Sequence, residues 1–482
     1  MKILMVASEA TPLIKVGGLA DVVGALPSAL AAAGHDVRIM LPRYGAFIEH
    51  GFGDVSTGQS VTVPWLGKKI VVEIFSGVLP GTATKLFTLH APSLFPGGAY
   101  VQEPSAEGFR AQMQRFTFFS WAAAHILQAL DWQPDVVHCH DWHAAGVPVF
   151  SRVIGHPLAA SVITIHNIES QGKWSARELF EWVGLAGTEL PELARRDPAG
   201  DFNLLQQALL VCDATTTVSP TYAHEILLPE YGFGLESTLA TLPGGITGIV
   251  NGIDVERFNP ATDQSIAAPY SAETVTAGKQ KNKAALEKLL HWTPGSQPIL
   301  GVVSRLTEQK GIDILIDALP AWVAGGGRLV VLGTGQPEIE QQLVMASQTY
   351  PQSVAVRIGF DALAAQQIYA GSDFFAMPSK FEPCGLGQLI AMRYGTLPIV
   401  RDTGGLHDTV VDCVDDPADG TGFVFQKFQS GALHAALDHA LQIWQKPDIL
   451  EAVRYRAMRR DFSWAASAEA YLRVYANLKK NT

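Results

Sequence analysis

Short apolar runs alternate with longer amphipathic segments along most of the chain. Continuous Val, Ile and Leu runs with helical segments between them are typical of parallel strands that are buried on both faces. Two groups of such runs fit two doubly wound α/β domains better than one very wide sheet. The runs expected to form strands are Ile3–Ala7, Val37–Leu41, Leu86–Leu89, Asp135–His140, Val162–Ile165 and Thr215–Val218 in the first half, and Ile299–Val303, Leu329–Leu332, Val354–Ile358, Phe374–Met377 and Leu397–Val400 in the second.

The join between the two halves is expected at the run Asn251-Gly-Ile-Asp254, ahead of a stretch rich in Pro and Ala. Apolar residues at helical spacing predict a final helix from Trp464 to Leu478, which could cap either domain. The expected organisation is a Rossmann-like domain at 1–252, a second at 253–457 and a C-terminal segment at 458–482.

Composition narrows the function classes. The chain has 482 residues, 48% of them hydrophobic and 17% charged, with a net charge of −11 and no long basic run. Nucleic acid is therefore not expected as a partner, and an anionic ligand must be held by local cations. The N-terminal apolar run is too short for a signal peptide, and no apolar segment approaches the ~20 residues that a membrane span needs. Four widely spaced cysteines without a Cys-x-x-Cys pair fit a reducing cytoplasm.

Glu382 lies in the run Ser379-Lys-Phe-Glu-Pro-Cys-Gly-Leu-Gly-Gln388, just before a small, flexible turn and an apolar stretch that is interpreted as a helix. Unpaired N–H groups at such a helix start bind anions, typically phosphate. The neighbouring carboxylate can accept hydrogen bonds from hydroxyl groups. The combination predicts a site for a sugar carried on a diphosphate. The alternative is an ordinary strand-to-helix turn with a surface Glu.

A second candidate phosphate site follows the first strand, where Lys15 precedes the pair Gly17-Gly18 at the start of an expected helix. A tight turn with a solvated Lys is the alternative. The spacing is not the Gly-x-Gly-x-x-Gly fingerprint of dinucleotide binding, which counts against a nicotinamide enzyme.

Arg305 and Lys310 follow the strand Ile299–Val303 and are five residues apart across a turn, so both can face one anion. These cations would bind a departing diphosphate more strongly as it gains charge. A structural salt bridge with Glu308 is the alternative.

Histidines gather at two expected strand ends. His166 follows one strand, and another ends in a polar run with three further histidines around an Asp and a Trp. Alternate residues of a strand share a face, so one interpretation is that His138 and His140 bind a metal as a pair. The other is a polar strand end that binds sugar through hydroxyl contacts and ring stacking. The residues of the run are His138, His140, Asp141, Trp142 and His143.

Two further glycine turns follow strands in the second half: Gly333-Thr-Gly335, and Thr403-Gly404-Gly405 after Asp402. With Glu382 they place three loops that allow close backbone approach at one edge of the second domain.

In this order the motifs resemble the glycogen/starch synthase family, and the resemblance runs nearly end to end. The motifs that carry it are Lys15-Val-Gly-Gly-Leu-Ala-Asp21, His138-x-His-Asp-Trp-His143, Val218-Ser-Pro-Thr-Tyr222, Asn251-Gly-Ile-Asp254, Ser304-Arg305 with Lys310-Gly311, Glu382-Pro-Cys-Gly-Leu386 and Thr403-Gly-Gly-Leu406.

The resemblance implies a GT-B architecture, in which two Rossmann-like domains face a cleft and the last helix returns to the N-terminal domain. It implies retaining transfer of glucose from ADP-glucose to the non-reducing end of an α-1,4-glucan, without a metal or another cofactor. Closure of the two domains is also expected, because Lys15 and Glu382 belong to different domains and must meet one ligand.

The resemblance also implies roles for individual residues. The catalytic residues would be Glu382, His166, Arg305 and Lys310. The donor would be bound by Lys15, Gly17, Gly18, Asp21, Asn251, Gly335, Leu386, Gly387, Thr403, Gly404 and Gly405, and Asp141 and Trp142 would line the acceptor side of the cleft.

The sequence departs from the family pattern in several places. Gly387 stands where Thr is usual, and Ile390 stands where many related enzymes place a second Glu for the ribose, which leaves ADP-glucose preferred over UDP-glucose. Three departures lie in the N-terminal domain, so the acceptor is the least secure inference: Gln206, Ser170 and the run Phe95-Pro-Gly-Gly98.

Two alternatives to a glucan synthase remain open from the sequence. One is a non-catalytic homologue that binds glucan or nucleotide sugar, and the other is the same chemistry on a short oligosaccharide or another acceptor. The sequence does not indicate the oligomeric state.

Overall fold

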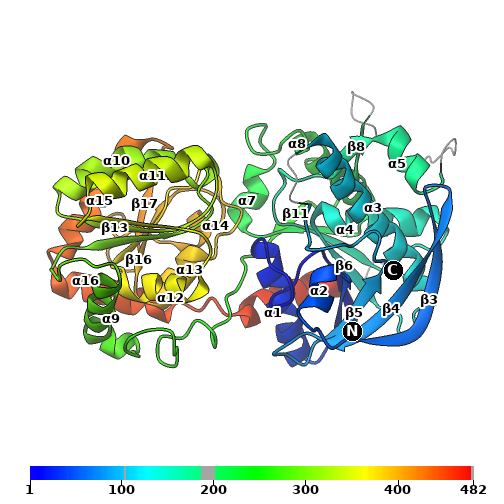
Figure 1. Cartoon of the computed structure of the whole chain (residues 1–482), viewed down its shortest axis with the longest axis horizontal. Helices are drawn as coiled ribbons and strands as arrows, with labels where there is room; N and C mark the ends of the chain where they lie inside the picture. The colour runs from blue at the N-terminus through cyan, green and yellow to red at the C-terminus, as the bar shows by residue number, and fades with distance from the viewer. Residues whose placement is uncertain (102–104, 186–200, 479–482) are drawn as a thin grey trace. The chain divides into compact units, whose positions relative to one another are not determined.

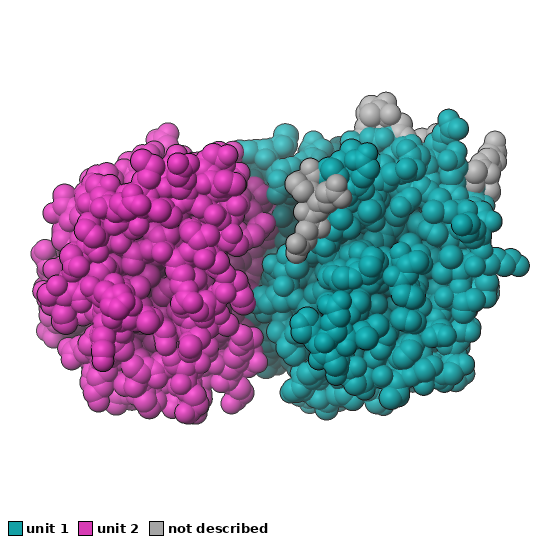
Figure 2. All heavy atoms as spheres, in the orientation of Figure 1, with its two compact units in different colours: residues 1–218, 223–252, 464–482 teal, residues 219–222, 253–463 magenta. Residues whose placement is uncertain are grey.

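The computed structural model describes residues 1–101, 105–185 and 201–478. The described chain forms two compact units (Figure 2). Unit 1 comprises residues 1–218, 223–252 and 464–482, and unit 2 comprises residues 219–222 and 253–463. Residues 458–463, which we expected in the C-terminal segment, thus group with unit 2.

Unit 1 is built on a mostly parallel sheet, which has nine strands in the described part of the chain and the order β11-β10-β7-β6-β1-β2-β5-β4-β3. A separate two-stranded sheet pairs β8 with β9. The strands are β1 (Lys2–Val6), β2 (Asp36–Pro42), β3 (Val55–Trp65), β4 (Lys68–Val78), β5 (Lys85–His90), β6 (Val136–His140), β7 (Ser161–Ile165), β8 (Lys173–Ser175), β9 (Asp201–Asn203), β10 (Ala214–Thr217) and β11 (Ile246–Gly248).

Helices cover both faces of this sheet (Figure 1). They are α1 (Gly18–Ala32), α2 (Gly45–Glu49), α3 (Ala106–Ala129), α4 (Asp141–Val153), α5 (Ala176–Trp182), α6 (Leu204–Val211), α7 (Pro220–Glu225), which begins in unit 2, α8 (Glu236–Leu239) and α17 (Trp464–Leu478). The final helix has the bounds expected from the sequence. It packs on α1 and on the strands of unit 1 through Tyr471, Tyr475 and Leu478, so the chain returns to this unit.

Unit 2 has a parallel sheet with six strands in the region described and the order β14-β13-β12-β15-β16-β17. The strands are β12 (Ile299–Val303), β13 (Arg328–Gly333), β14 (Val354–Ile358), β15 (Phe374–Met377), β16 (Leu397–Arg401) and β17 (Phe423–Phe425). The α-helices around it are α9 (Val275–Leu289), α10 (Ile312–Ala324), α11 (Pro337–Thr349), α12 (Ala362–Gly371), α13 (Gly387–Arg393), α14 (Gly404–Thr409), α15 (Ser430–Trp444) and α16 (Pro447–Arg459).

All eleven strands expected from apolar runs are present, which confirms two doubly wound α/β units. The pattern missed β3, β4, β8, β9, β11 and β17. The hairpin β3–β4 was missed because its apolar runs are short: buried and exposed residues alternate over part of each strand, and the longest run in β4, residues 70–72, ends at Glu73. Its turn, Leu66-Gly67, has the two positive φ angles of a tight hairpin turn.

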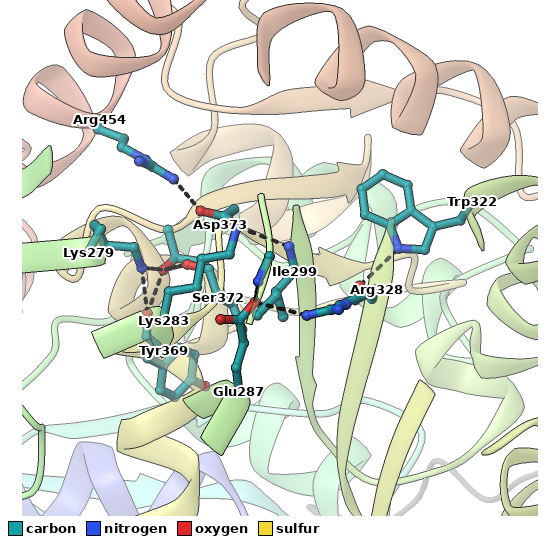
Figure 3. Close-up of polar contacts among 12 residues, drawn as sticks. Lys279, Lys283, Glu287, Ile299, Trp322, Arg328, Tyr369, Ser372, Asp373 and Arg454 are labelled. Carbon is teal, nitrogen blue, oxygen red and sulfur yellow. Dashed lines mark hydrogen bonds and ion pairs between the residues drawn. The ribbon is translucent and has the colours of Figure 1, made fainter. Parts of the chain in front are cut away.

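The buried face of α9 carries three charged residues beside the apolar Val275 and Leu286. Lys279, Lys283 and Glu287 lie four residues apart and are all buried. Lys283 pairs with Asp373, which precedes β15, and Glu287 pairs with Arg328 at the start of β13 (Figure 3). These ion pairs tie α9 to the amino ends of the central strands, the edge opposite to the one where ligands bind in such sheets.

Candidate active site

Each of the two large sheets has one point at which the order of its strands reverses. Several of the candidate residues follow the strands that meet at these points. In unit 1 the chain moves outward from β1 in one direction and from its neighbour β6 in the other. In unit 2 the corresponding neighbours are β12 and β15. Ligands of open α/β sheets bind at the carboxyl ends of strands at such points. Lys15, Asp141, Arg305 and Glu382 all follow one of these four strands.

The loop after β1 presents Lys15 beside the start of α1. Lys15 Nζ lies 2.7 Å from the carboxylate of Asp21, which is in the first turns of α1, and the Lys15 side chain is 42% exposed. The N–H of Gly17 was expected to bind phosphate, but in this structure it donates to the buried carboxylate of Glu9, 3.1 Å away. A role for Gly17 and Gly18 in binding the donor therefore stays a prediction.

The histidines of β6 and β7 form a buried hydrogen-bonded group. His138 has both ring nitrogens engaged, with Tyr475 Oη at 2.7 Å and Thr164 Oγ1 at 2.6 Å. His140 Nδ1 lies 2.9 Å from His166 Nε2. Because His138 has no nitrogen left to ligate, the structure argues against the metal-binding pair. Among the described residues, no group of three or more His, Cys, Asp or Glu side chains could hold a metal ion.

Burial keeps His166 neutral. It lowers the pKa of His166 to about 3, because the charged ring would lose its solvation. Asp141 accepts a hydrogen bond from the His166 backbone N–H at 2.7 Å and thereby fixes the start of the His166 loop. Burial raises the pKa of Asp141 to about 7. An uncharged imidazole at this place suits hydrogen bonding to sugar hydroxyls better than binding to phosphate.

Two other predicted residues of unit 1, Trp142 and Asn251, are both buried. Trp142 is only 6% exposed, with Phe116 and His143 against it and Gly172 packed on its ring. In this structure the ring is thus a core group and not the exposed stacking surface that we expected. Asn251 is also buried, and its Oδ1 has no hydrogen-bond partner among the described residues.

In unit 2, one of the two predicted cations contacts the carboxylate. Lys310 Nζ lies 2.6 Å from Glu382 Oε2, and Ser379 Oγ donates to the same oxygen at 2.9 Å. Lys310 therefore pairs with Glu382 and not with Glu308, the neighbour that we weighed for a structural salt bridge. Arg305 is exposed, with a hydrogen bond from Nη2 to Gln309 at 3.1 Å.

The predicted glycine turns of unit 2 approach other loops of the same unit. A Cβ on Gly335 would lie 2.1 Å from the Leu306 carbonyl, beside Arg305. A Cβ on Gly404 would lie 2.0 Å from the Glu382 carbonyl, and one on Gly405 would lie 2.2 Å from the Cys384 carbonyl. Only glycine allows these contacts. These turns therefore hold the Arg305 and Glu382 loops in place, and direct contact with the donor stays a prediction.

The start of α13 agrees only in part with the family pattern. Leu386 is the residue that caps α13, and Gly387 is its first residue, so both lie where backbone N–H groups are unpaired within a helix. Gly387 packs against Phe375 and Met377, which fill the space that a larger side chain would need. Ile390 is buried in the core of unit 2. Thr403 is buried and caps α14.

Three residues at the carboxyl edges of the two large sheets were missed from the sequence: Phe360 and Arg401 in unit 2 and Glu9 in unit 1. Phe360 follows β14 and is 84% exposed. Arg401, at the end of β16, donates to the carbonyls of Ser379 and Lys380 and so supports the Glu382 loop. Glu9 follows β1. The general rule that ligands bind after strands could have drawn attention to Phe360 and Glu9.

Comparisons with known proteins agree with this geometry. The starch synthase catalytic domain family matches residues 2–241, and the family of glycosyl transferases group 1 matches residues 291–456. The chain is 39% identical to a glycogen synthase of Francisella tularensis subsp. novicida over 99% of both chains. It is 40% identical to glycogen synthase 2 of Geobacter metallireducens, over 100% of this chain and 99% of the relative.

Solved structures show the same relationship. The catalytic domain of starch synthase IV from Arabidopsis thaliana, bound to ADP and acarbose, superposes with a TM-score of 0.88 at 34% identity, over 99% of each chain. A sucrose-phosphate synthase from Thermosynechococcus elongatus shares the fold, with a TM-score of 0.60 at 19% identity. No helix in the described ranges is long and apolar enough to cross a membrane. The chain has the GT-B fold and belongs to the glycogen/starch synthase family of glycosyltransferases.

Proposed function

We propose that this chain transfers glucose from ADP-glucose to the non-reducing end of an α-1,4-glucan, with retention of the anomeric configuration. The observation that carries the proposal is the contact between Lys310 and Glu382 at the carboxyl ends of β12 and β15, with the exposed Arg305 in the same loop as Lys310. A nucleotide sugar needs cations for its diphosphate and an acceptor of hydrogen bonds for its sugar, and these residues supply both.

Three cations would hold the diphosphate: Lys15 of unit 1 and Arg305 and Lys310 of unit 2. The N–H groups of Leu386 and Gly387 at the start of α13 would assist them. As the bond to glucose breaks, the diphosphate gains negative charge, so these contacts stabilise the transition state more than the ground state. Loss of one such contact is expected to lower turnover by about 10²–10³-fold.

Glu382 would orient the glucose rather than attack it. Its Oε2 already accepts two hydrogen bonds, from Lys310 and Ser379, which fix the carboxylate and leave Oε1 to accept a sugar hydroxyl. Retention without a nucleophile calls for a front-face route, in which the departing phosphate accepts the proton of the acceptor hydroxyl. Neutral His166 would donate to or accept from a glucose hydroxyl. Asp21, Asp141 and Asn251 would complete the lining of the site.

Phe360 would bind the nucleotide base. Its ring is exposed just after β14, on the sheet edge that also carries Arg305. Aromatic side chains stack on bases of any sequence. The ADP bound to starch synthase IV supports an adenine nucleotide, and Ile390 stands in place of the Glu that related enzymes use for the ribose.

A short oligosaccharide is the second candidate acceptor, and the departures in unit 1 favour testing it. Arg115 donates hydrogen bonds to the carbonyls of Pro96, Gly98 and Ala99 and thereby fixes the unusual loop at 95–99. Gln206 donates to Thr238 Oγ1 at 3.0 Å. Neither arrangement supplies a charge for a ligand.

The test is transfer of labelled glucose from ADP-glucose, and separately UDP-glucose, to glycogen and to maltotriose, with and without a chelator. We expect α-1,4-linked product from ADP-glucose, unchanged by the chelator because cations and helix starts replace a metal. The ratio between the two acceptors distinguishes a glycogen synthase from an enzyme for short chains. Binding of ADP without any transfer would instead support a non-catalytic homologue.

A further inference from the structure

Glu9 is a buried carboxylate in the loop that carries Lys15. It is 3% exposed and lies three residues after the end of β1, at the carboxyl edge of the unit 1 sheet. Buried carboxylates are rare unless they are paired or hydrogen-bonded, so the contacts of Glu9 show what it stabilises.

One oxygen of Glu9 binds the backbone directly after Lys15. Glu9 Oε2 accepts hydrogen bonds from the N–H groups of Val16, at 2.5 Å, and Gly17, at 3.1 Å. These two residues connect Lys15 to the first residue of α1. The carboxylate thus closes the loop from Glu9 to Gly17 and fixes the backbone from which the Lys15 side chain extends. Lys15 itself is exposed and makes its ion pair with Asp21.

The other oxygen of Glu9 is fixed by a distant part of unit 1. Tyr100 Oη donates to Glu9 Oε1 at 2.5 Å, and it also lies 3.3 Å from Ser8 Oγ. Burial and the nearby carboxylate raise the pKa of Tyr100 well above its usual value, so the phenol keeps its proton and donates. The Tyr100 ring packs against Phe116 and His143. Both carboxylate oxygens of Glu9 are therefore held by hydrogen bonds.

Two effects of Glu9 on the binding of an anionic ligand are consistent with this arrangement. Glu9 could occupy the anion position at the start of α1 and repel a diphosphate, or it could fix the loop so that Lys15 meets the diphosphate. Its burial and the fixed position of both oxygens favour the second effect. A carboxylate that leaves to admit a ligand would have to break three hydrogen bonds at once.

We propose that Glu9 is a positioning residue of the donor site, which acts through Lys15 and depends on Tyr100. The inference rests on the proposed function, since it assigns Lys15 to the donor diphosphate. It concerns the geometry of the loop and not direct contact between Glu9 and the substrate.

The test is a double-mutant cycle on the whole chain, with ADP affinity measured by calorimetry and kcat measured with ADP-glucose. The variants are Glu9→Ala, Lys15→Met and the double variant. We expect Glu9→Ala to weaken ADP binding about tenfold in the wild-type background and by less than about threefold when Lys15 is already Met, as for residues that act as one unit. Equal losses in both backgrounds would overturn the proposal, because a merely structural role gives additive effects.

Two conservative variants keep the test decisive if Glu9→Ala does not fold. Glu9→Gln retains a carbonyl oxygen for the Val16 and Gly17 N–H groups, so it should retain most of the ADP affinity. Tyr100→Phe removes only the second anchor and should weaken ADP binding less than Glu9→Ala. Tighter ADP binding by Glu9→Gln than by the wild type would show that the carboxylate repels the ligand and would overturn the proposal.

ADP affinity also separates this inference from the proposed function. If the wild-type chain binds ADP but transfers no glucose, the function fails while the cycle on ADP affinity still tests Glu9. If transfer occurs and the cycle shows no coupling, the function stands and the role of Glu9 fails.

Discussion

Lys310 and Glu382, which the sequence analysis linked to the diphosphate and the sugar respectively, are ion-paired with each other at 2.6 Å. Their side chains are 17% and 7% exposed, so the pair is largely shielded from water. The pairing fixes the carboxylate that is proposed to orient the glucose and the cation that is proposed to stabilise the leaving group. A change at either residue is therefore expected to disturb both.

Glu382→Gln is expected to lower kcat by about 10²–10³-fold, because the neutral amide orients the sugar less strongly and no longer fixes Lys310. ADP affinity should be retained or increase, since Lys310 no longer shares its charge with a carboxylate. Steady-state kinetics and calorimetry with ADP measure the two effects. Glu308→Gln is the matched control, because Glu308 is an exposed carboxylate in the same loop as Lys310. Near-full activity of Glu382→Gln would remove Glu382 from the mechanism.

Asp141→Asn is expected to stabilise the chain at neutral and alkaline pH. The buried carboxyl has a pKa of about 7, against 3.8 for the exposed group, so the folded state binds more protons between these values. The free energy of unfolding contributed by Asp141 therefore falls as the pH rises through this range, by up to about 4 kcal/mol. Asn removes the titration, and its Oδ1 can still accept from the His166 N–H. Asn also tolerates the positive φ of 56° found here.

Denaturant unfolding at several pH values tests this expectation. The stability difference between Asp141→Asn and the wild type should be large at pH 8 and should shrink as the pH falls toward 4. The buried histidines titrate in both proteins, so their effect cancels in the difference. A difference that does not change with pH would show that Asp141 is ionised in the folded chain throughout this range.

Substitutions of Lys279 and of its neighbour Lys283 are expected to change the stability of unit 2 in opposite directions (Figure 3). Lys283 pairs with Asp373 at 2.6 Å, and Arg454 takes the other Asp373 oxygen at 2.8 Å. Within the described ranges, Lys279 donates to Thr396 Oγ1 and to the Tyr369 carbonyl. Burial, with Arg454 and Lys283 nearby, holds the pKa of Lys279 well below its usual value.

Lys279→Met is therefore expected to stabilise unit 2, by about 1–3 kcal/mol at pH 7, because it removes a buried amine whose charged form pairs with no carboxylate among the described residues. Lys283→Met should destabilise by about 3–5 kcal/mol, because it leaves Asp373 with one cation fewer. The pKa of Lys279 is lower in the folded state than in the unfolded chain, so the unfolded chain binds more protons between the two values. The wild-type stability should therefore rise as the pH increases from 7 toward 10, and Lys279→Met should lose this rise. Thermal unfolding that shows the same sign for both variants would contradict the distinction.

The sequence predicted what depends on continuous patterns and missed what depends on the path of the chain. Strands such as β12 and β15 are buried on both faces, so their apolar runs are visible without a structure. The edge strand β3 and its neighbour β4 have apolar runs of three residues at most, because polar residues interrupt them.

The same distinction holds for the site. The sequence identified Lys310 and Glu382 as functional candidates, but not their ion pair, because they are 72 residues apart. Glu9 was missed because a single carboxylate in a loop has no pattern and its partner Tyr100 lies 91 residues further along. The glycines at 335, 404 and 405 were recognised as points of close approach. Their neighbours proved to be other backbone segments, which a sequence does not identify.

Gly387 gives the most direct test of how this chain differs from the family pattern. Thr is usual at this position, where its hydroxyl could contact phosphate. Here a Cβ would lie 2.9 Å from Phe375 Cε1 and 3.1 Å from Met377 Sδ, so both side chains would have to move. Gly387→Thr should therefore destabilise unit 2 by about 1–3 kcal/mol, as overpacking of a core does.

A second substitution should separate packing from ligand binding. Phe375→Leu makes room beside residue 387, so the double variant with Gly387→Thr should regain stability relative to Gly387→Thr alone. If the hydroxyl then contacts phosphate, the double variant should bind ADP more tightly than Phe375→Leu alone. Thermal unfolding and ADP calorimetry on the three variants measure both effects. Full stability of Gly387→Thr by itself would show that the Phe375 and Met377 side chains move at little cost. Their size would then not explain why glycine occupies position 387.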